Sequence, residues 1–565
     1  MQQAIQEIIQ EIEKRNISTE KELEKLSNQI SKKYKLNPSP RKIHILLNAD
    51  ESQRKKLSKI LKTKPIRTLS GVAPIAVFSA PTSCPPQAQC TFCPGGPGSV
   101  FGNVPKAYTG NEPASRRAAR NHYDPYLQIF NRLEHYSLIN HDFDKVEIIT
   151  MGGTFTFLPE QYKNKFITYV YKALNDFSDM FLKNKQLDFQ KFKEFFELPA
   201  YDLNDVSRTE RIQKKLLELK DKNFQDLENE KIRNETSNIR CVSLLIETRP
   251  DCGKLKEGNE ILGYGGTKIE LGIQSVYDED LEFVKRGHSV HDSIESIQIL
   301  KDLGFKLNFH YMIGLTPDKK KDLEGLKRLF SDPNFRPDML KIYPCLVMHG
   351  TPLYELWKEN KYLPISAQEA TEIISEAKKF IPKYLRIQRI QRDIPSTVIA
   401  AGPIRTNLRQ DIEKLCIKKG IKCQCIRCRE PMNKEIDWNS VKLLTLKYEA
   451  SNGKEYFISF EDTKNNLILG FCRLRLPYQF LREEITEKTA IVRELHVYGP
   501  AVKIGDRGKV QHKGLGKKLM REAEKIALKN NKSKMLVISG VGVKDYFINK
   551  LGYQKEGPYV SKFLS

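Results

Sequence analysis

The sequence contains no apolar run close to the roughly 20 consecutive residues that a membrane-spanning helix requires. It also shows no signal or transit peptide, because the first residues carry several glutamates and place four isoleucines at helical spacing: Ile5, Ile8, Ile9 and Ile12. No internal repeat is visible. Eleven cysteines in 565 residues, without a secretory signal, do not read as a disulfide framework. We therefore expect a soluble, cytoplasmic, multidomain protein without a membrane partner.

Acidic residues are fewer than basic ones, 70 against 94, and the resulting net charge of +24 favours polyanionic partners such as RNA or DNA. Charge alone names no partner, since solvated lysine-rich faces give the same total. The basic side chains gather once, in residues 41–70, where nine lysines and arginines face only Asp50 and Glu51. That density is typical of a surface that follows phosphates, so we interpret residues 1–70 as a basic, tRNA-binding segment.

Apolar β-rich runs alternate with helical patterns between residues 71 and 393. The strand-like runs are VEIIT, VSLLIET, KIELGIQS, KLNFHYMIG and MLKIYPCLV, and the helical ones include FITYVYKAL and DSIESIQILKDLG. Alternating strands and helices predict an α/β fold with a parallel sheet, here a partial or full (β/α) barrel. Sites in such folds gather at the carboxyl ends of the strands. Residues 177–237 are rich in Lys, Asp and Glu and are interpreted as a helical insertion.

The first cysteine cluster is CPPQAQCTFCPGGPG, with thiols at Cys84, Cys90 and Cys93. Three thiolates at this spacing could hold three irons of a four-iron cluster and leave the fourth iron open for chemistry. A zinc ion with a fourth ligand from elsewhere is the alternative. The glycines that follow would let the backbone approach a cluster closely, which a zinc site does not need.

The second cluster, CQCIRCRE, brings Cys423, Cys425 and Cys428 together in residues 394–438. We interpret this stretch as a linker stapled by a structural zinc, with reduced and unmetallated thiols as the alternative. Cys416 is the nearest candidate for a fourth ligand, and a histidine or water from another segment remains open. The scattered cysteines are interpreted as small buried hydrophobes: Cys241, Cys252, Cys345 and Cys472.

Residues 439–565 change pattern to antiparallel strands, VKLLTLKYEA, EYFISFED and NLILGFCRLRL, followed by IVRELHVYG and QHKGLGKKLMREAEKIAL. The last string places glycines where a strand turns into a helix, so that backbone N–H groups can receive a pyrophosphate. With the segments MLVISG and GVKDYFINKLGY, this region resembles a GNAT-type acetyltransferase domain. In that fold the glycine-rich turn holds acetyl-CoA.

The first cysteine cluster, followed by ITMGGTFT, resembles a radical S-adenosylmethionine (SAM) enzyme, although its first gap is longer than the common family spacing. It is similar to the catalytic subunit of Elongator, in the archaeal form, where the same longer gap leads into CPGGP. The likeness continues through YTGNEPASRRAARNHYDPY, ETRPD, ELGIQSVYDEDL, RGHSVHDSIESIQILKDLGFK, YPCLVMHGTPLYELW and RIQRIQRDIP. It implies that Cys84, Cys90 and Cys93 hold a 4Fe-4S cluster and that Gly152, Gly153 and Thr154 bind SAM. Pro86 departs from the family, which often has His there.

The same likeness covers RELHVYGPAV and SGVGVKDYFINKLGY, and it implies an acetyl-CoA site in the C-terminal region. The residues it assigns to that site are Glu494, Leu495, His496, Val497, Gln511, His512, Lys513, Gly514, Leu515, Gly516, Tyr546 and Phe547. Tyr546 carries the catalytic hydroxyl, because Phe547 stands where the family often has a second tyrosine. An aromatic residue on a helix is, however, more often part of the core.

The function implied by the resemblance is modification of the wobble uridine in the tRNA anticodon stem-loop. The adenosyl radical takes hydrogen from the acetyl methyl group, the carbon radical adds to carbon 5 of uracil, and thioester hydrolysis leaves 5-carboxymethyluridine. A homodimer or Elongator-like accessory subunits are the further partners considered. Two alternatives remain, a protein or histone lysine acetyltransferase with a structural iron-sulfur cluster, and a non-catalytic RNA-binding assembly subunit.

Overall fold

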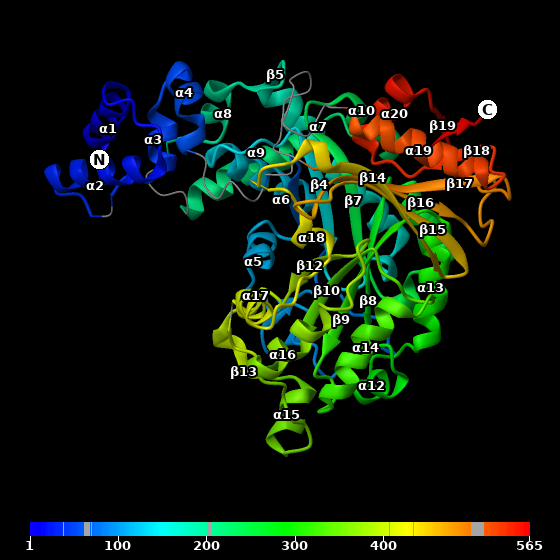
Figure 1. Cartoon of the computed structure of the whole chain (residues 1–565). Helices are drawn as coiled ribbons and strands as arrows, with labels where there is room; N and C mark the ends of the chain where they lie inside the picture. Colours follow the sequence, from blue (N-terminus) through cyan, green and yellow to red (C-terminus); the bar gives the residue numbers. More distant parts are fainter. Residues whose placement is uncertain are drawn as a thin grey trace. The chain divides into compact units, whose positions relative to one another are not determined.

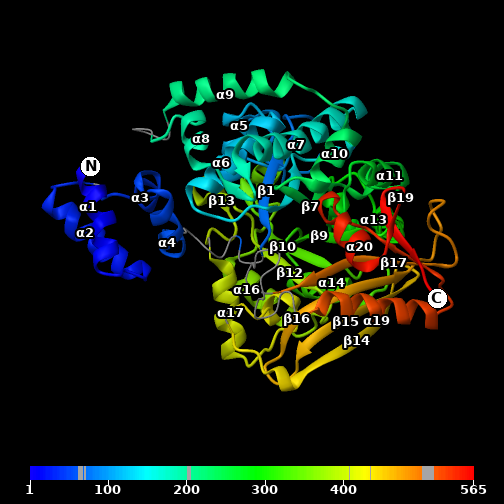
Figure 2. The same ribbon diagram turned by 90° about the horizontal axis from the view of Figure 1, so that it is seen from above.

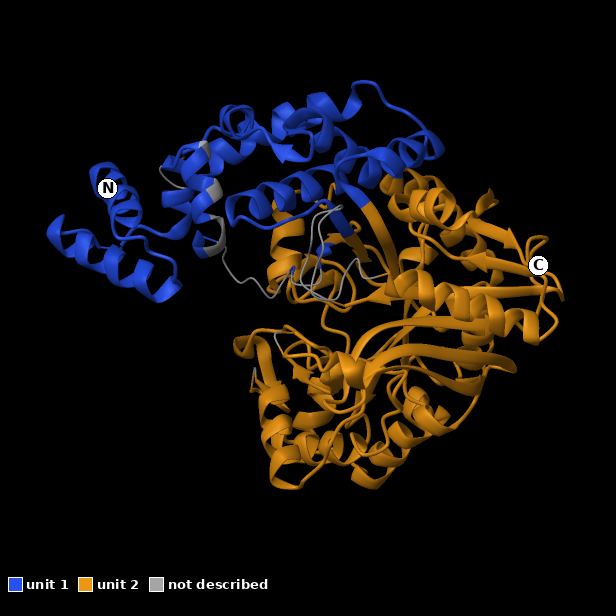
Figure 3. Ribbon diagram, turned by 45° about the horizontal axis from the view of Figure 1, so that its top comes forward, with its two compact units in different colours: residues 1–75, 125–146, 168–240 blue, residues 76–124, 147–167, 241–565 orange. Residues whose placement is uncertain are grey.

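The computed structural model describes residues 1–37, 39–61, 68, 71–199, 205–405, 407–432, 434–498 and 514–565. The chain forms two compact units (Figure 3). The first comprises residues 1–75, 125–146 and 168–240, and the second comprises residues 76–124, 147–167 and 241–565. No described helix has both the length and the apolar content needed to cross a bilayer.

The first unit is largely helical. The predicted N-terminal helix forms and buries its isoleucines, and Thr19 begins the second helix with a capping box to Glu22. The unit contains α1 (Gln2–Lys14), α2 (Glu20–Lys33), α3 (Lys42–Asn48), α4 (Glu51–Leu61), α6 (Pro125–Leu138), α8 (Phe189–Phe195), α9 (Val206–Asp221), α10 (Leu227–Thr236), most of α7 (Glu160–Phe181), and the hairpin of β5 (Leu182–Lys183) and β6 (Gln186–Leu187).

A seven-stranded sheet has the order β1-β4-β7-β8-β9-β10-β12, and its neighbouring strands from β7 to β12 are parallel. The strands are β1 (Ala73–Phe78), β4 (Lys145–Met151), β7 (Arg240–Thr248), β8 (Lys268–Gln274), β9 (Lys306–Ile313), β10 (Met339–Pro344) and β12 (Arg386–Ile390). The connecting helices are α11 (Leu255–Gly263), α12 (Asp278–Phe283), α13 (Val290–Asp302), α14 (Lys319–Ser331), α15 (Pro352–Lys358) and α16 (Ala367–Ala377) (Figure 1). All of β8 is buried, as both faces of a parallel sheet usually are. The predicted parallel half-barrel is confirmed.

A second sheet, also of seven strands, lies in the second unit and has the order β14-β15-β16-β17-β18-β20-β19. Its members are β14 (Val441–Ala450), β15 (Gly453–Asp462), β16 (Leu467–Leu476), β17 (Thr489–Val497), β18 (Lys534–Val537), β19 (Gln554–Glu556) and β20 (Tyr559–Phe563). Neighbours are antiparallel except β17 and β18. Helix α19 (Leu515–Lys529) packs its apolar side on this sheet (Figure 2), and α20 (Lys544–Leu551) follows β18.

Buried ion pairs join the two sheets within this second unit. Three arginines of β16 and β17, Arg473, Arg475 and Arg493, are almost inaccessible to solvent. Their partners are the carboxylates of Asp302, Asp338, Glu455 and Glu494. Asp338 directly precedes β10, and the Tyr559 hydroxyl donates to the Leu303 carbonyl just before β9 at 2.9 Å. The second sheet therefore packs near the amino ends of strands β9 and β10.

Candidate functional site

The first cysteine cluster lies in the loop between β1 and β2 (Gly96–Ser99). Its thiols are part-buried, and each lies next to a polar group. The Cys84 Sγ is 3.5 Å from the Thr154 hydroxyl, Arg286 donates to the Cys90 Sγ at 3.3 Å, and the Ala107 N–H donates to the Cys93 Sγ at 3.3 Å. Donors of this kind stabilise a thiolate. The loop therefore presents three thiols suited to metal ligation.

The distances between the sulfur atoms differ between the two cysteine clusters. The sulfur atoms of Cys423, Cys425 and Cys428 all lie within 4.8 Å of one another, whereas those of the first cluster are not all that close. Zn–S bonds of about 2.3 Å give a tetrahedron with edges of roughly 3.8 Å. The compact set thus suits a single zinc ion, and the wider set suits a cluster in which each thiolate binds a different iron.

The glycine turn after β4 contacts this loop. Gly152 and Gly153 have φ angles of 128° and 99°, which favour glycine. A Cβ on Gly152 would lie 2.3 Å from the Ser79 Oγ, and one on Gly153 would lie 3.0 Å from the Lys106 Cβ. The Ser79 hydroxyl is fully buried and has no hydrogen-bond partner among the described residues. A cramped turn with an unpaired hydroxyl beside it fits a small polar ligand.

Two arginines that the sequence analysis assigned no role organise the cysteine loop. Arg286 donates to the Gly272 carbonyl and to Cys90, and Arg249 donates to the Arg286 carbonyl at 2.8 Å and pairs with Asp251. Burial, together with the Arg286 cation, lowers the pKa of His288 to about 4, so this imidazole is neutral. The signal was present in the ETRPD and RGHSV motifs, which place an arginine just beyond a strand or helix.

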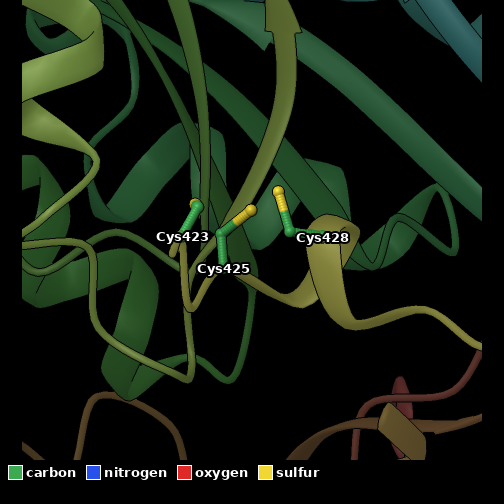
Figure 4. Close-up of side chains that lie close together, drawn as sticks. All are labelled: Cys423, Cys425 and Cys428. Atoms are coloured by element: carbon green, nitrogen blue, oxygen red, sulfur yellow. The ribbon is translucent and has the colours of Figure 1, made fainter. Parts of the chain in front are cut away.

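In the second cysteine cluster, Cys423 and Cys425 lie in the loop that leads into the short helix α18 (Ile426–Arg429), and Cys428 lies within this helix. Figure 4 shows the sulfur atoms of Cys425 and Cys428 pointing toward one another. Hydrogen bonds from the two neighbouring thiols hold the pKa of Cys425 well below its usual value. Cys416, on α17 (Leu408–Lys418), does not belong to this group of three. The buried Arg429 ties the loop to β15 through Glu461, at 2.8 Å.

The predicted acetyl-CoA residues meet in part at the start of α19. Gly514 is the N-cap, with a φ of 75°. A Cβ on Gly516 would lie 3.2 Å from the Tyr546 hydroxyl, 3.8 Å from Val497 and 3.9 Å from Leu495. The ladder between β17 and β18 ends at Val492 and Val537, so within the described chain the later backbone of β17 has no strand partner on that side. An open edge beside a helix N-terminus suits an anionic, extended ligand.

The other described residues of this prediction do not all face the start of α19. Gln511, His512 and Lys513 fall outside the described residues. Glu494 and His496 lie on the opposite face of β17 from Leu495 and Val497, where Glu494 pairs with Lys306 and Arg473 and His496 packs on Phe471 and Tyr498. Phe547 is buried in the core against Tyr553, and Leu515 is buried at the start of α19.

Comparison with known proteins matches two family models, ELP3 N-terminal domain at residues 1–69 and Radical_SAM C-terminal domain at residues 337–417. The chain is 43% identical over 573 residues to the tRNA uridine(34) acetyltransferase of Methanocaldococcus jannaschii, covering 99% of this chain and 97% of that protein. It is 37% identical over 552 residues to Elongator complex protein 3 of Saccharomyces cerevisiae, covering 95% and 91%. The chain belongs to the Elongator complex protein 3 family.

A solved structure agrees with this assignment. The archaeal Methanocaldococcus infernus Elp3 with an N-terminal deletion (1-46) superposes with a TM-score of 0.70 at 39% identity, covering 88% of this chain and all of that one. The family membership confirms the predicted resemblance to Elongator and the prediction of a radical SAM enzyme. Enzymes with the radical SAM fold bind a four-iron cluster and SAM. Both were among the predicted cofactors.

Proposed function

We propose that this chain converts the wobble uridine of tRNA to 5-carboxymethyluridine, with the acetyl group of acetyl-CoA supplying the added carbons. The observation that carries the proposal is the presence, in one compact unit, of a three-thiol loop beside a glycine turn and an open anion site at the start of α19. The name of a 43% identical relative, tRNA uridine(34) acetyltransferase, supports a tRNA uridine as the substrate.

In this proposal Cys84, Cys90 and Cys93 hold the iron-sulfur cluster. A reduced cluster bound there would supply the electron that cleaves SAM to a 5'-deoxyadenosyl radical. Arg286 and the Ala107 N–H stabilise the negative charge on the Cys90 and Cys93 thiolates through their 3.3 Å contacts. Gly152, Gly153 and Thr154 bind the methionine end of SAM, which the contact of the Thr154 hydroxyl with the Cys84 thiol supports.

Gly514, Leu515 and Gly516 receive the pyrophosphate of acetyl-CoA on the backbone N–H groups of α19, and Gln511, His512 and Lys513 are further candidate contacts for acetyl-CoA. Leu495, Val497 and Tyr546 line the acetyl end, and Tyr546 provides the catalytic hydroxyl, whose pKa burial raises. Glu494, His496 and Phe547 help to shape the site from outside. Their side chains do not lie on the side that the glycine turn faces. With these roles, residues 439–565 form a GNAT-type domain.

Cys423, Cys425 and Cys428 bind a structural zinc in residues 394–438, and Cys416 lies outside this group of three thiols. The basic segment at residues 41–70 contributes to binding the anticodon stem-loop, since ammonium and guanidinium groups replace phosphate counterions. The reaction takes place in the cytoplasm, where tRNA is available, and other Elongator-like subunits or a second copy of the chain are the candidate protein partners.

The proposal is tested by anaerobic incubation of the reconstituted protein with SAM, acetyl-CoA and tRNA. We expect 5'-deoxyadenosine with the wild-type protein and less than a tenth as much with Cys90→Ser. Cys241→Ser, which changes a buried thiol outside the cluster, is the matched control. Equal 5'-deoxyadenosine from wild type and Cys90→Ser would contradict the assigned cluster site.

A further inference from the structure

A set of buried polar side chains from four neighbouring strands lines the half-barrel. Glu247 on β7 is paired in register with Glu270 on β8, and Glu270 is paired with Asn308 on β9. One step further along, His310 on β9 is paired with Lys341 on β10. Because alternate residues of a strand share a face, Asn308 and His310 point to the same side of the sheet. We call Glu247, Glu270, Asn308, His310 and Lys341 the strand polar set.

The members of this set touch one another. The Lys341 ammonium lies 2.5 Å from Glu270 and 4.0 Å from Glu247. His310 Nε2 lies 3.0 Å from Glu270, and Asn308 donates to Glu270 at 2.5 Å. Glu270 is only 1% exposed, whereas His310 is 17% exposed. The set is therefore buried at Glu270 and open to a ligand at His310.

A metal ion is not the natural occupant, although two carboxylates and an imidazole converge here. The Lys341 ammonium already lies between the carboxylates and supplies the positive charge that a cation would bring. Burial nevertheless requires that each polar atom find a partner. The Asn308 Oδ1 is completely buried and has none among the described residues, which indicates a missing hydrogen-bonding ligand or water.

Protonation states leave a defined pattern of donors and acceptors. Burial raises the pKa of Glu247 to about 8, so it carries a proton at neutral pH. Although burial opposes ionisation, Lys341 and His310 hold the pKa of Glu270 well below its usual value. His310, whose pKa burial lowers to about 4, is neutral and must donate from Nε2 to the ionised Glu270. With the proton on Nε2, the Nδ1 atom is left as an acceptor.

The strand polar set is connected to the cysteine loop by residues 106–108. The Tyr108 hydroxyl donates to Glu247 at 3.1 Å, and the neighbouring Ala107 N–H donates to the Cys93 Sγ. Lys106 lies against the glycine turn at Gly153. Tyr343 provides an aromatic ring 5.5 Å from the His310 ring. A flat ligand bound here would lie close to the radical chemistry and beside an aromatic ring.

We infer that the strand polar set binds the Watson–Crick edge of the target uracil, with the His310 Nδ1 accepting from N3–H and the Lys341 ammonium donating to a ring carbonyl. Uracil presents an N3–H donor beside carbonyl acceptors, which an imidazole acceptor and an ammonium donor can complement. The inference rests on the proposed function. It gives His310 and Lys341 a role in recognising the base, and Glu247, Glu270 and Asn308 a role in positioning them.

The test compares His310→Ala with wild-type full-length, reconstituted protein on two tRNA substrates, one with uridine and one with 3-methyluridine at the wobble position. The methyl group removes the N3–H, so wild type should modify the uridine substrate at least about 10-fold faster in kcat/KM. His310→Ala should lower the rate on uridine at least about 10-fold and lose most of this preference. His310→Asn, which keeps an acceptor, should recover part of both.

His349→Ala, on an exposed histidine outside the set, is the matched control and should behave as wild type. Tyr108→Phe is a second variant, expected to lower the rate on uridine without reducing the melting temperature. Wild-type preference for uridine retained in His310→Ala overturns the inference alone. A parallel loss of 5'-deoxyadenosine formed without tRNA also overturns it, because the set would then hold SAM. No uridine product from wild type overturns the proposed function and, with it, the inference.

Discussion

Arg493 on β17 forms a two-pronged ion pair with Asp338, in which Nη1 and Nη2 each lie 2.7 Å from a carboxylate oxygen. Both side chains are buried, and the same guanidinium contacts Glu455 at 2.9 Å. Asp338 precedes a strand of the half-barrel, whereas Arg493 belongs to the second sheet. The two sheets are therefore joined by charges that neither can leave unpaired without a large cost.

Arg493→Met should destabilise the protein by about 3–5 kcal/mol, because it removes one guanidinium partner from each of the buried carboxylates Asp338 and Glu455. The control is Arg211→Met on α9, which breaks an exposed ion pair with Glu197 and should lower the stability by at most about 1 kcal/mol. Chemical unfolding of both variants measures the difference. Equal and small losses would show that the buried pair does not hold the sheets together.

Cys425→Ser should release the bound zinc and lower the melting temperature, because Cys425 belongs to the compact group of three thiols. Cys416→Ser is the control, since this buried thiol lies outside the group, and it should keep the metal. Metal analysis and thermal unfolding of the purified variants measure both effects. Zinc loss from Cys416→Ser would make Cys416 the fourth ligand.

Gly514→Val should weaken acetyl-CoA binding at least about 10-fold, because a side chain at the N-cap of α19 obstructs the backbone N–H groups that receive the pyrophosphate. Gly552→Val is a closely matched control. Both glycines have a φ of 75° and open space around the missing Cβ, so the backbone strain is similar. Calorimetric titration with acetyl-CoA should show weaker binding for Gly514→Val only, and equal weakening would indicate a general effect of strain.

Glu247 should make the protein less stable as the pH rises from about 4.5 to about 8. Burial raises its pKa from 4.5 to about 8, so the folded state holds a proton that the unfolded state has lost in this window. The free energy of unfolding then falls by at most about 1.4 kcal/mol per pH unit. Glu247→Gln cannot ionise and should show a smaller fall. Parallel stability curves for wild type and variant would exclude this titration.

The position of most half-barrel strands along the chain could be predicted from the sequence, because each run such as KIELGIQS or KLNFHYMIG is bounded by turns and separated by a helical pattern. Cysteine spacing and the glycine-rich turn also placed candidate ligands on identifiable segments. These signals are local, and each depends on residues within about 20 positions of one another along the chain.

The remaining features depend on partners distant in sequence. Arg475 pairs with Asp302, and both are completely buried, yet nothing near either residue in the sequence marks them as partners. The strand polar set was equally hidden, although Asn308 and His310 stand two residues apart in a predicted strand and so had to share a face. Polar residues at alternate positions in a buried strand were the signal that could have found it.

The central claim is tested most directly by mass spectrometry of tRNA nucleosides after anaerobic reaction of the reconstituted, full-length protein with SAM and acetyl-CoA. The account predicts 5-carboxymethyluridine at the wobble position, absent when either cofactor is omitted. With acetyl-CoA labelled in the acetyl carbons, the added group should carry both labels. Unmodified tRNA from a preparation that forms 5'-deoxyadenosine, or labelled acetyl-lysine in place of a modified uridine, would contradict it.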